Sequence, residues 1–363
     1  MAYTSLHMKA NAATASRRLF LLCVIAAAGI ALAACARNEA QAGPAGALAE
    51  PLRVEFALNT VCTVMLYDQA RPEVYDAIFS RIREIERLMS VFLPDSDISR
   101  INAAAGIEPV QVHEDVFKVI ERAVHIAELS GGAFDPTVGP LTFLWGITGG
   151  SPRVPSQEEI DAVLPLVNWR YIELDPQERT VFLKQPGMAL DLGAIAKGYA
   201  ADEALAIIQE ARLERALIDL GGNVITFGTR PDGALWRAGL QTPLGRQGEI
   251  LGVISGSNMT IVTSGVSQRY FMYDGVRYHH LFSPFEGHPA RTGLLAATIV
   301  TQVSMDADAL STAIFVLGYE KGRALIEPLE GVEAIFLFED RSIRKTPGID
   351  FELHNENFRL LTD

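Results

Sequence analysis

The sequence predicts an α+β fold, in which helices pack against a mixed, largely antiparallel sheet. Helical and strand patterns both occur, but they do not alternate as regular strand–helix–strand units. Strand patterns dominate residues 215–302. The chain has 363 residues, of which 49% are hydrophobic, so it can bury a sizeable core. No internal repeat or linker is visible after residue 52, and we expect one domain over residues 51–363.

Helices dominate the first half of this domain. Ile78, Ile82 and Ile85 form an apolar stripe with charged residues between them, as in an amphipathic helix. Ser156 and Glu159 have the spacing of a capping box at a helix start. The expected elements are a strand at 52–67, helices at 72–89 and 115–129, a helix after Ser156, and a hairpin of strands at 171–175 and 180–183.

Strands dominate the second half, after a helix that is entered from a glycine-containing turn. Their sequences are rich in β-branched and aromatic residues and are bounded by turn residues. The expected elements are a helix at 194–211, strands at 216–220, 236–241, 258–263, 269–273, 278–282 and 295–302, a helix from about Asp308, and a strand at 333–338.

The N-terminus has the pattern of an export signal. Arg17 and Arg18 precede an uncharged, mostly apolar run at 19–34, which is shorter than the roughly 20 residues of a membrane-spanning helix. The run ends Leu-Ala-Ala before Cys35, which resembles a bacterial lipoprotein signal with Cys35 as the lipidated residue. An ordinary signal peptide with an incidental cysteine is the alternative. We therefore expect a signal peptide at 1–34 and a flexible tether at 35–50.

The net charge limits the kinds of partner to expect, and the cysteine content limits the disulfides. The net charge is −13 and no long basic run occurs, which argues against nucleic acid as a partner. An acidic protein that handles a phosphorylated ligand needs a cation to offset repulsion. Cys23 and Cys35 fall in the export segment, so Cys62 is left alone and no disulfide is expected in the domain.

The segment most informative about chemistry is residues 306–312, Asp-Ala-Asp-Ala-Leu-Ser-Thr. If a helix opens here, Asp308, Ser311 and Thr312 lie on one face. A carboxylate with two hydroxyls suits a hard cation that prefers oxygen ligands and keeps positions open for phosphate. The alternative is an acidic helix N-terminus, in which Asp and Ser side chains bond free backbone N–H groups.

Residues 191–199, Asp-Leu-Gly-Ala-Ile-Ala-Lys-Gly-Tyr, form a second candidate site. Gly193 and Gly198 permit close backbone approach at a helix entry, where free N–H groups attract phosphate. Lys197 adds a positive charge, and Tyr199 offers a ring for stacking. The alternative is an ordinary strand-to-helix turn with packing glycines.

Several further segments are weak signals when taken singly. The Gly- and Pro-rich loop at 131–141 holds Phe134 and Asp135, and such loops are usually turns but can also form the wall of a planar-ligand site. His279 and His280 end a strand, where a histidine is more often structural than a base. The sequence contains no zinc-type His/Cys spacing, no nucleophile elbow, no Walker loop and no dinucleotide fingerprint.

Together these segments resemble the ApbE family, the FAD:protein FMN transferases. The resemblance extends over residues 60–318 and implies one domain related to the T-fold. The matching segments are 89–92, 132–141 with Trp145 and Gly146, 191–199, 219–223, 263–265, His280 with Pro284, and 307–312.

The resemblance implies a reaction and a set of roles. Members cleave the pyrophosphate of FAD, attach FMN to a Thr or Ser hydroxyl of a partner protein and release AMP, using Mg²⁺. The catalytic residues would be His280, as the base, and Asp308. The metal ligands would be Asp308, Ser311, Thr312 and the carbonyl of Ala196. The FAD contacts would be Val61, Met89, Ser90, Phe92, Ala133, Phe134, Asp135, Gly193, Lys197, Tyr199 and Phe282.

Three segments depart from the usual family pattern. Residues 61–63 are Val-Cys-Thr where Met-Gly-Thr is usual. Residues 266–269 are Val-Ser-Gln-Arg in place of an acidic and aromatic run, and residues 280–287 lack the usual Asp and Thr. These changes affect the expected choice of acceptor and the transfer rate more than FAD binding.

The resemblance leaves three functions open. The first is a lipid-anchored periplasmic transferase whose acceptors are flavoprotein subunits of membrane electron-transport complexes. The second is a pyrophosphatase that releases free FMN and AMP, with water in place of the acceptor hydroxyl. The third is a flavin-binding lipoprotein without catalysis, because a site can bind without reacting.

Overall fold

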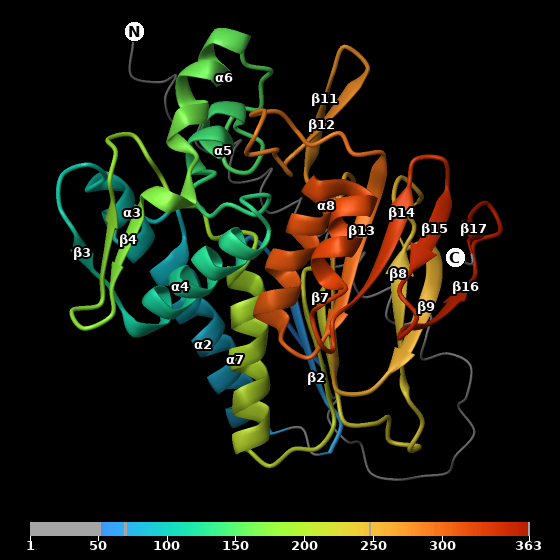
Figure 1. Cartoon of the computed structure of the whole chain (residues 1–363). Coiled ribbons are helices and arrows are strands. Elements are labelled where there is room, and N and C mark those ends of the chain that lie inside the picture. The colour runs from blue at the N-terminus through green and yellow to red at the C-terminus, as the bar shows by residue number, and fades with distance from the viewer. Residues whose placement is uncertain (1–51, 69–70, 247, 362–363) are drawn as a thin grey trace, which may run out of the picture. The chain divides into compact units, whose positions relative to one another are not determined.

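The computed structural model describes residues 52–68, 71–246 and 248–361, and residues 49–363 form one compact unit (Figure 1). Helices and mostly antiparallel strands confirm the predicted α+β class. The predicted signal peptide, the tether and Cys35 lie outside the described residues. No helix in the described part is long and apolar enough to cross a membrane.

A nine-stranded sheet forms the centre of the described domain, in the order β1-β2-β6-β7-β10-β13-β14-β15-β17. Within it, β17 pairs with β15 in parallel, and the other neighbours are antiparallel. The strands are β1 (Leu52–Ala57), β2 (Thr60–Leu66), β6 (Ala216–Leu220), β7 (Asn223–Phe227), β10 (Met259–Gly265), β13 (Leu294–Thr301), β14 (Glu333–Phe338), β15 (Ser342–Lys345) and β17 (Arg359–Leu360).

Helices pack against this sheet and against one another. The apolar stripe of α2 is fully buried, as its spacing predicts. Helices α7 and α8 pack on each other, and α8 also lies against β10 and β13. The helices are α2 (Pro72–Met89), α3 (Asp97–Ala103), α4 (Glu114–Leu129), α5 (Gly139–Trp145), α6 (Gln157–Val163), α7 (Ala196–Glu210) and α8 (Ser304–Ile326), with 3₁₀ turns η1 (Leu164–Leu166) and η2 (Trp169–Tyr171).

Three small sheets complete the described fold. A hairpin of β11 (Tyr270–Tyr273) and β12 (Val276–His279) stands apart from the central sheet (Figure 1). The second sheet contains β8 (Trp236–Gln241), β9 (Ile250–Gly256) and β16 (Asp350–Leu353). The third contains β3 (Val110–Gln111), β4 (Ile172–Asp175) and β5 (Thr180–Leu183), so the predicted hairpin at 171–183 is confirmed.

Two differences from the sequence prediction concern the first strands and helix α8. The strand predicted at 52–67 is two strands, because Leu58 and Asn59 adopt left-handed conformations with φ of 52° and 56° and turn the chain back on itself. The helix predicted from about Asp308 starts at Ser304, so Asp308 lies in its second turn rather than at its N-terminus. Asp308 is therefore too far along α8 to cap that helix, and can cap only a neighbouring one.

The contact between α7 and α8 depends on Gly198. A Cβ atom at this position would lie 2.2 Å from the carbonyl oxygen of Ser304 and 2.6 Å from the Cα of Met305. Both neighbours are backbone atoms, so they cannot move without shifting the start of α8. Only glycine permits this approach of the two helices.

Gly198→Ala should therefore lower the free energy of unfolding by about 3 kcal/mol, the upper part of the range for overpacked sites. Urea unfolding measures this change. Gly150→Ala is the matched control, because a Cβ there meets no atom closer than 3.9 Å. Equal stability of the two variants would contradict the steric account.

Candidate active site between helices α7 and α8

Each of the two helices supplies a carboxylate that caps the other. Asp308 of α8 accepts a hydrogen bond from the backbone N–H of Gly198, in the first turn of α7, at 3.1 Å. Asp202 of α7 accepts from the N–H groups of Ser304 and Met305, at 2.8 and 2.9 Å, at the start of α8. Asp308 is thus a helix cap, as the alternative interpretation of the sequence proposes, but of α7 and not of its own helix. This reciprocal capping fixes the position of the Asp308 carboxylate.

Lys197 lies directly against this carboxylate. Its Nζ is 3.0 and 3.1 Å from the two carboxylate oxygens of Asp308 and also donates to the carbonyl of Gly193 at 2.8 Å. The side chain of Asp308 is 5% exposed and that of Lys197 is 22% exposed. A buried carboxylate of this kind needs a cation beside it. The structure brings the two sequence segments singled out above into one site.

Three hydroxyl groups lie beside Asp308. The Oγ of Ser264, at the end of β10, is 2.9 Å from Ser311 Oγ and 3.1 Å from Thr312 Oγ1. Ser311 is fully buried and donates to the carbonyl of Asp308 at 3.0 Å, whereas Thr312 is half-buried. Ser264 was not among the predicted ligands, although its position at a strand end beside glycine marks it in the sequence.

The donor set fits a hard divalent cation such as Mg²⁺. It contains one carboxylate and the hydroxyls beside it, all oxygen donors, and Ala196, the fourth predicted ligand, is the first residue of α7. Within the described residues, no group of three or more His, Cys, Asp or Glu side chains could hold a metal alone. A single carboxylate suits Mg²⁺ that completes its octahedron with waters and phosphate oxygens. Both carboxylate oxygens of Asp308 face a positive charge, the ammonium of Lys197.

His280 has the geometry of a neutral proton acceptor. Its Nδ1 lies 3.2 Å from the carbonyl oxygen of Arg269, which can only accept, so Nδ1 carries the proton and the lone pair is on Nε2. Burial and the positive charge of Arg269 lower the pKa of His280 to about 3, with a further contribution from Lys197. The imidazole is therefore neutral at physiological pH.

Arg269 is a second cation in this region. Burial lowers the pKa of its guanidinium, and the charges of Asp191 and Asp308 act in the opposite direction. Its side chain also donates to the carbonyl of Asn59 at 3.3 Å. Arg269 was not predicted as a site residue, because only the fold brings residue 269 near residues 191 and 308. With Lys197 it supplies positive charge suited to a pyrophosphate.

The residues predicted to contact the flavin differ in how exposed their side chains are. Phe92 is 53% exposed and Gly193 is also exposed, whereas Val61 and Ser90 are half-buried. Phe282 is buried and packs against Trp145, with ring centroids 5.8 Å apart. The remaining apolar members of the set are buried in the core: Met89, Ala133 and Phe134.

Two predicted contacts have internal partners. Tyr199 is 2% exposed, and its hydroxyl donates to Asp115 at 2.6 Å, so its ring does not offer the stacking surface that the sequence suggests. The carboxylate of Asp135 accepts from the backbone N–H groups of Thr137 and Trp169, at 2.8 and 3.1 Å. Asp135 thereby organises its loop, and burial raises the pKa of its carboxyl group.

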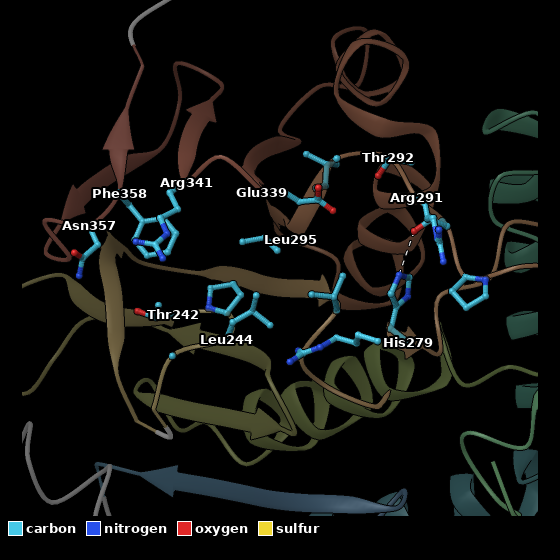
Figure 2. Close-up of a pocket in the computed structure, with 18 of the residues that line it drawn as sticks. Thr242, Leu244, His279, Arg291, Thr292, Leu295, Glu339, Arg341, Asn357 and Phe358 are labelled. Carbon is cyan, nitrogen blue, oxygen red and sulfur yellow. Dashed lines mark hydrogen bonds between the residues drawn. The ribbon is translucent and has the colours of Figure 1, made fainter. Parts of the chain in front are cut away.

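His279, the neighbour of His280, is structural. It lines a cavity of about 860 Å³ whose lining does not include Lys197, His280 or Asp308 (Figure 2). Its Nε2 donates to the carbonyl of Ala290 at 3.1 Å, and its Nδ1 accepts from the N–H of Leu281 at 3.3 Å. The bond to Nδ1 requires the neutral ring, because a protonated Nδ1 cannot accept. Burial lowers the pKa of His279 to about 4.

The protein should therefore lose stability in mild acid. A folded-state pKa below the unfolded value of about 6.5 gives a contribution that is present above pH 6.5 and is lost as the pH falls toward 4. Urea unfolding at pH 7.5 and 5.0 measures this loss. His279→Gln should show a smaller loss between these two values than the wild type, and an equal loss would contradict the account.

Comparison with known proteins identifies the family. The family model described as "ApbE family" matches residues 58–336. A FAD:protein FMN transferase of Treponema pallidum (strain Nichols) is 38% identical over 82% of this chain and 87% of its own length, and one of Klebsiella pneumoniae (strain 342) is 39% identical over 73% and 82%. The crystal structure of an ApbE protein from Thermotoga maritima has a TM-score of 0.76 at 34% identity, covering 82% of this chain and 96% of that one. The protein therefore belongs to the ApbE family.

Proposed function

We propose that this protein transfers FMN from FAD to a Thr or Ser hydroxyl of a partner flavoprotein, with Mg²⁺, and releases AMP. Its family membership makes it an enzyme, a flavin transferase. The observation that carries the finer proposal is the placement of Asp308. Its carboxylate is fixed by Gly198 and Lys197, beside the Thr312 hydroxyl and within electrostatic range of Arg269.

The residues of this site account for each part of the transfer. His280 takes the proton of the acceptor hydroxyl on Nε2, and the hydroxyl oxygen forms a bond to the phosphorus of the FMN half. The bond from that phosphorus to the bridging oxygen breaks, and AMP leaves with the oxygen and its electron pair. Lys197 and Arg269 offset the negative charge that develops. Mg²⁺, when bound by Asp308, Ser311, Thr312 and the Ala196 carbonyl, would supply further positive charge at the pyrophosphate.

The proposed location follows from the N-terminal sequence. Cleavage before Cys35 and lipidation of that residue would anchor the enzyme to a membrane on the periplasmic side. The acceptors would then be flavoprotein subunits of membrane electron-transport complexes. This part of the proposal is supported by the signal-like sequence alone.

Release of AMP from FAD tests the chemistry. We expect the purified domain with FAD and Mg²⁺ to release AMP faster when an acceptor flavoprotein is present, and EDTA to stop the release. AMP and free FMN in equal amounts, with no dependence on acceptor, would identify a pyrophosphatase instead. Bound FAD that stays intact under all conditions would identify a flavin-binding protein.

A further inference from the structure

The β11–β12 hairpin exposes an unusual number of large apolar side chains. Met272 and Tyr273 are 55% and 54% exposed, and Tyr270 and Val276 are 43% and 39% exposed. The hairpin projects away from the central sheet (Figure 1). A cluster of apolar side chains at a projecting tip is typical of a surface that a partner covers.

The base of this hairpin is part of the candidate active site. The strands connect Arg269 to His280, and the backbone N–H of His280 donates to the carbonyl of Arg269 at 3.1 Å. One face of the hairpin is held in place, since Phe271 stacks on Tyr278 and Tyr278 packs on Trp145, with centroids 5.3 and 5.5 Å apart. The tip residues are thus presented by a supported hairpin that leads directly to the proposed base.

The cavity of about 860 Å³ lies beside the same hairpin and is rich in arginine. Figure 2 shows Arg291 near His279 at one end of the cavity and Arg341 near Phe358 at the other. Arg277 of β12 also lines the cavity and lies over the ring of Tyr270, at 4.0 Å. Within the described residues, none of these three arginines forms an ion pair with a carboxylate.

Neither glutamate of the cavity forms an ion pair with these arginines in the described part of the chain. Glu249 accepts from the side-chain amide of Asn355 at 2.7 Å and from the backbone N–H of Arg246 at 3.1 Å. Glu339 is exposed and directly follows β14. In a chain with a net charge of −13, a cavity with three arginines and two glutamates attracts an acidic segment that the rest of the surface repels.

We propose that the β11–β12 tip and the arginine-lined cavity together dock the acceptor protein, and that its modified segment is acidic and flanked by apolar side chains. This inference rests on the proposed transfer of FMN to a protein hydroxyl. Apolar residues of the acceptor cover the hairpin tip, and its carboxylates meet Arg277 and Arg291. His280 does not line the cavity but follows β12 at the base of the hairpin, so the acceptor segment passes around this base to bring its hydroxyl to His280.

Two synthetic peptides test the proposal with the purified domain, FAD and Mg²⁺. Each has a single threonine and the same leucines, and they differ only in carrying aspartates or lysines near the threonine. We expect kcat/KM for flavinylation of the aspartate peptide to exceed that of the lysine peptide by at least about tenfold. Arg291→Glu should reduce or reverse this preference.

The hairpin tip is tested by the double variant Met272→Ser with Tyr273→Ser. We expect KM for the aspartate peptide to rise by about tenfold with kcat retained, because the chemistry is unchanged. Ile107→Ser is the matched control, as Ile107 is 74% exposed in the loop between α3 and β3 and should leave KM unchanged.

The outcomes that would overturn the docking surface differ from those that would overturn the FMN transfer reaction. Equal KM values for the wild type and the double variant, or no preference between the peptides, would overturn the proposed surface. Flavinylation of neither peptide by an enzyme that still flavinylates an intact acceptor protein would also overturn it, while leaving the transferase intact. All variants should bind FAD with the wild-type Kd, because none of the altered residues belongs to the α7–α8 site.

Discussion

Asp308→Asn is expected to lower FAD turnover at least about 100-fold while the protein stays folded. The amide oxygen can still accept the N–H of Gly198, so the cap on α7 is retained. The negative charge is lost, and with it the group that faces Lys197 and would hold Mg²⁺. The amide therefore removes the charge and leaves the shape of the side chain nearly unchanged.

AMP release from FAD at several Mg²⁺ concentrations measures this effect. We expect the residual activity of Asp308→Asn to require a much higher Mg²⁺ concentration than the activity of the wild type does. Asp306→Asn is the matched control, because Asp306 lies two residues before Asp308 in α8 but pairs with Arg122, at 2.6 Å. If both variants retain full turnover, Asp308 is not a metal ligand.

His280→Gln should reduce the transfer rate by about 10²- to 10⁴-fold, the usual contribution of a general base. Glutamine keeps a polar side chain at the base of the hairpin, but its amide cannot take up a proton at physiological pH. FAD binding should persist, since Lys197 and Asp308 are unchanged. His288→Gln is the control, because His288 bonds Gln157 at the start of α6.

The pH profile offers a sharper test of His280. Burial and neighbouring cations lower its pKa to about 3 in the free protein, so the imidazole is neutral from pH 8 down to well below 6.5. We expect kcat/KM for the acceptor to show no acid limb near pH 6.5, the range in which an unperturbed histidine loses its basic form. A limb at pH 6.5 that His280→Gln removes would contradict this description of the site.

Elements with a strong local signal could be predicted from the sequence. Helix α2 has the predicted bounds, and the capping box at Ser156 and Glu159 forms as expected, with both side-chain bonds present. Strands β7 and β9 are among those that the sequence did not predict. The sequence of β9, Ile-Leu-Gly-Val-Ile-Ser-Gly, contains two glycines, and β7 follows a tight turn at Gly221 and Gly222, so neither has a clear strand pattern.

The candidate site could be predicted only in part, because its contacts join residues far apart in the chain. The spacing of Asp308, Ser311 and Thr312 indicates one helix face, but nothing local predicts that Lys197 pairs with Asp308 or that Ser264 bonds both hydroxyls. Tyr199 illustrates the opposite error. Its position after the glycine-containing turn at 191–198 suggests that its ring stacks on a ligand. In the structure the ring is buried, and its hydroxyl bonds Asp115 of α4.

Mass spectrometry of an acceptor flavoprotein subunit, incubated with the purified domain, FAD and Mg²⁺, tests the central claim most directly. The account predicts a covalent gain of one FMN on a single Thr or Ser, which is absent with EDTA and with Asp308→Asn. Free FMN and AMP without an adduct on any acceptor tested, or FAD that stays bound and intact, would contradict the assignment of this chain as a protein FMN transferase.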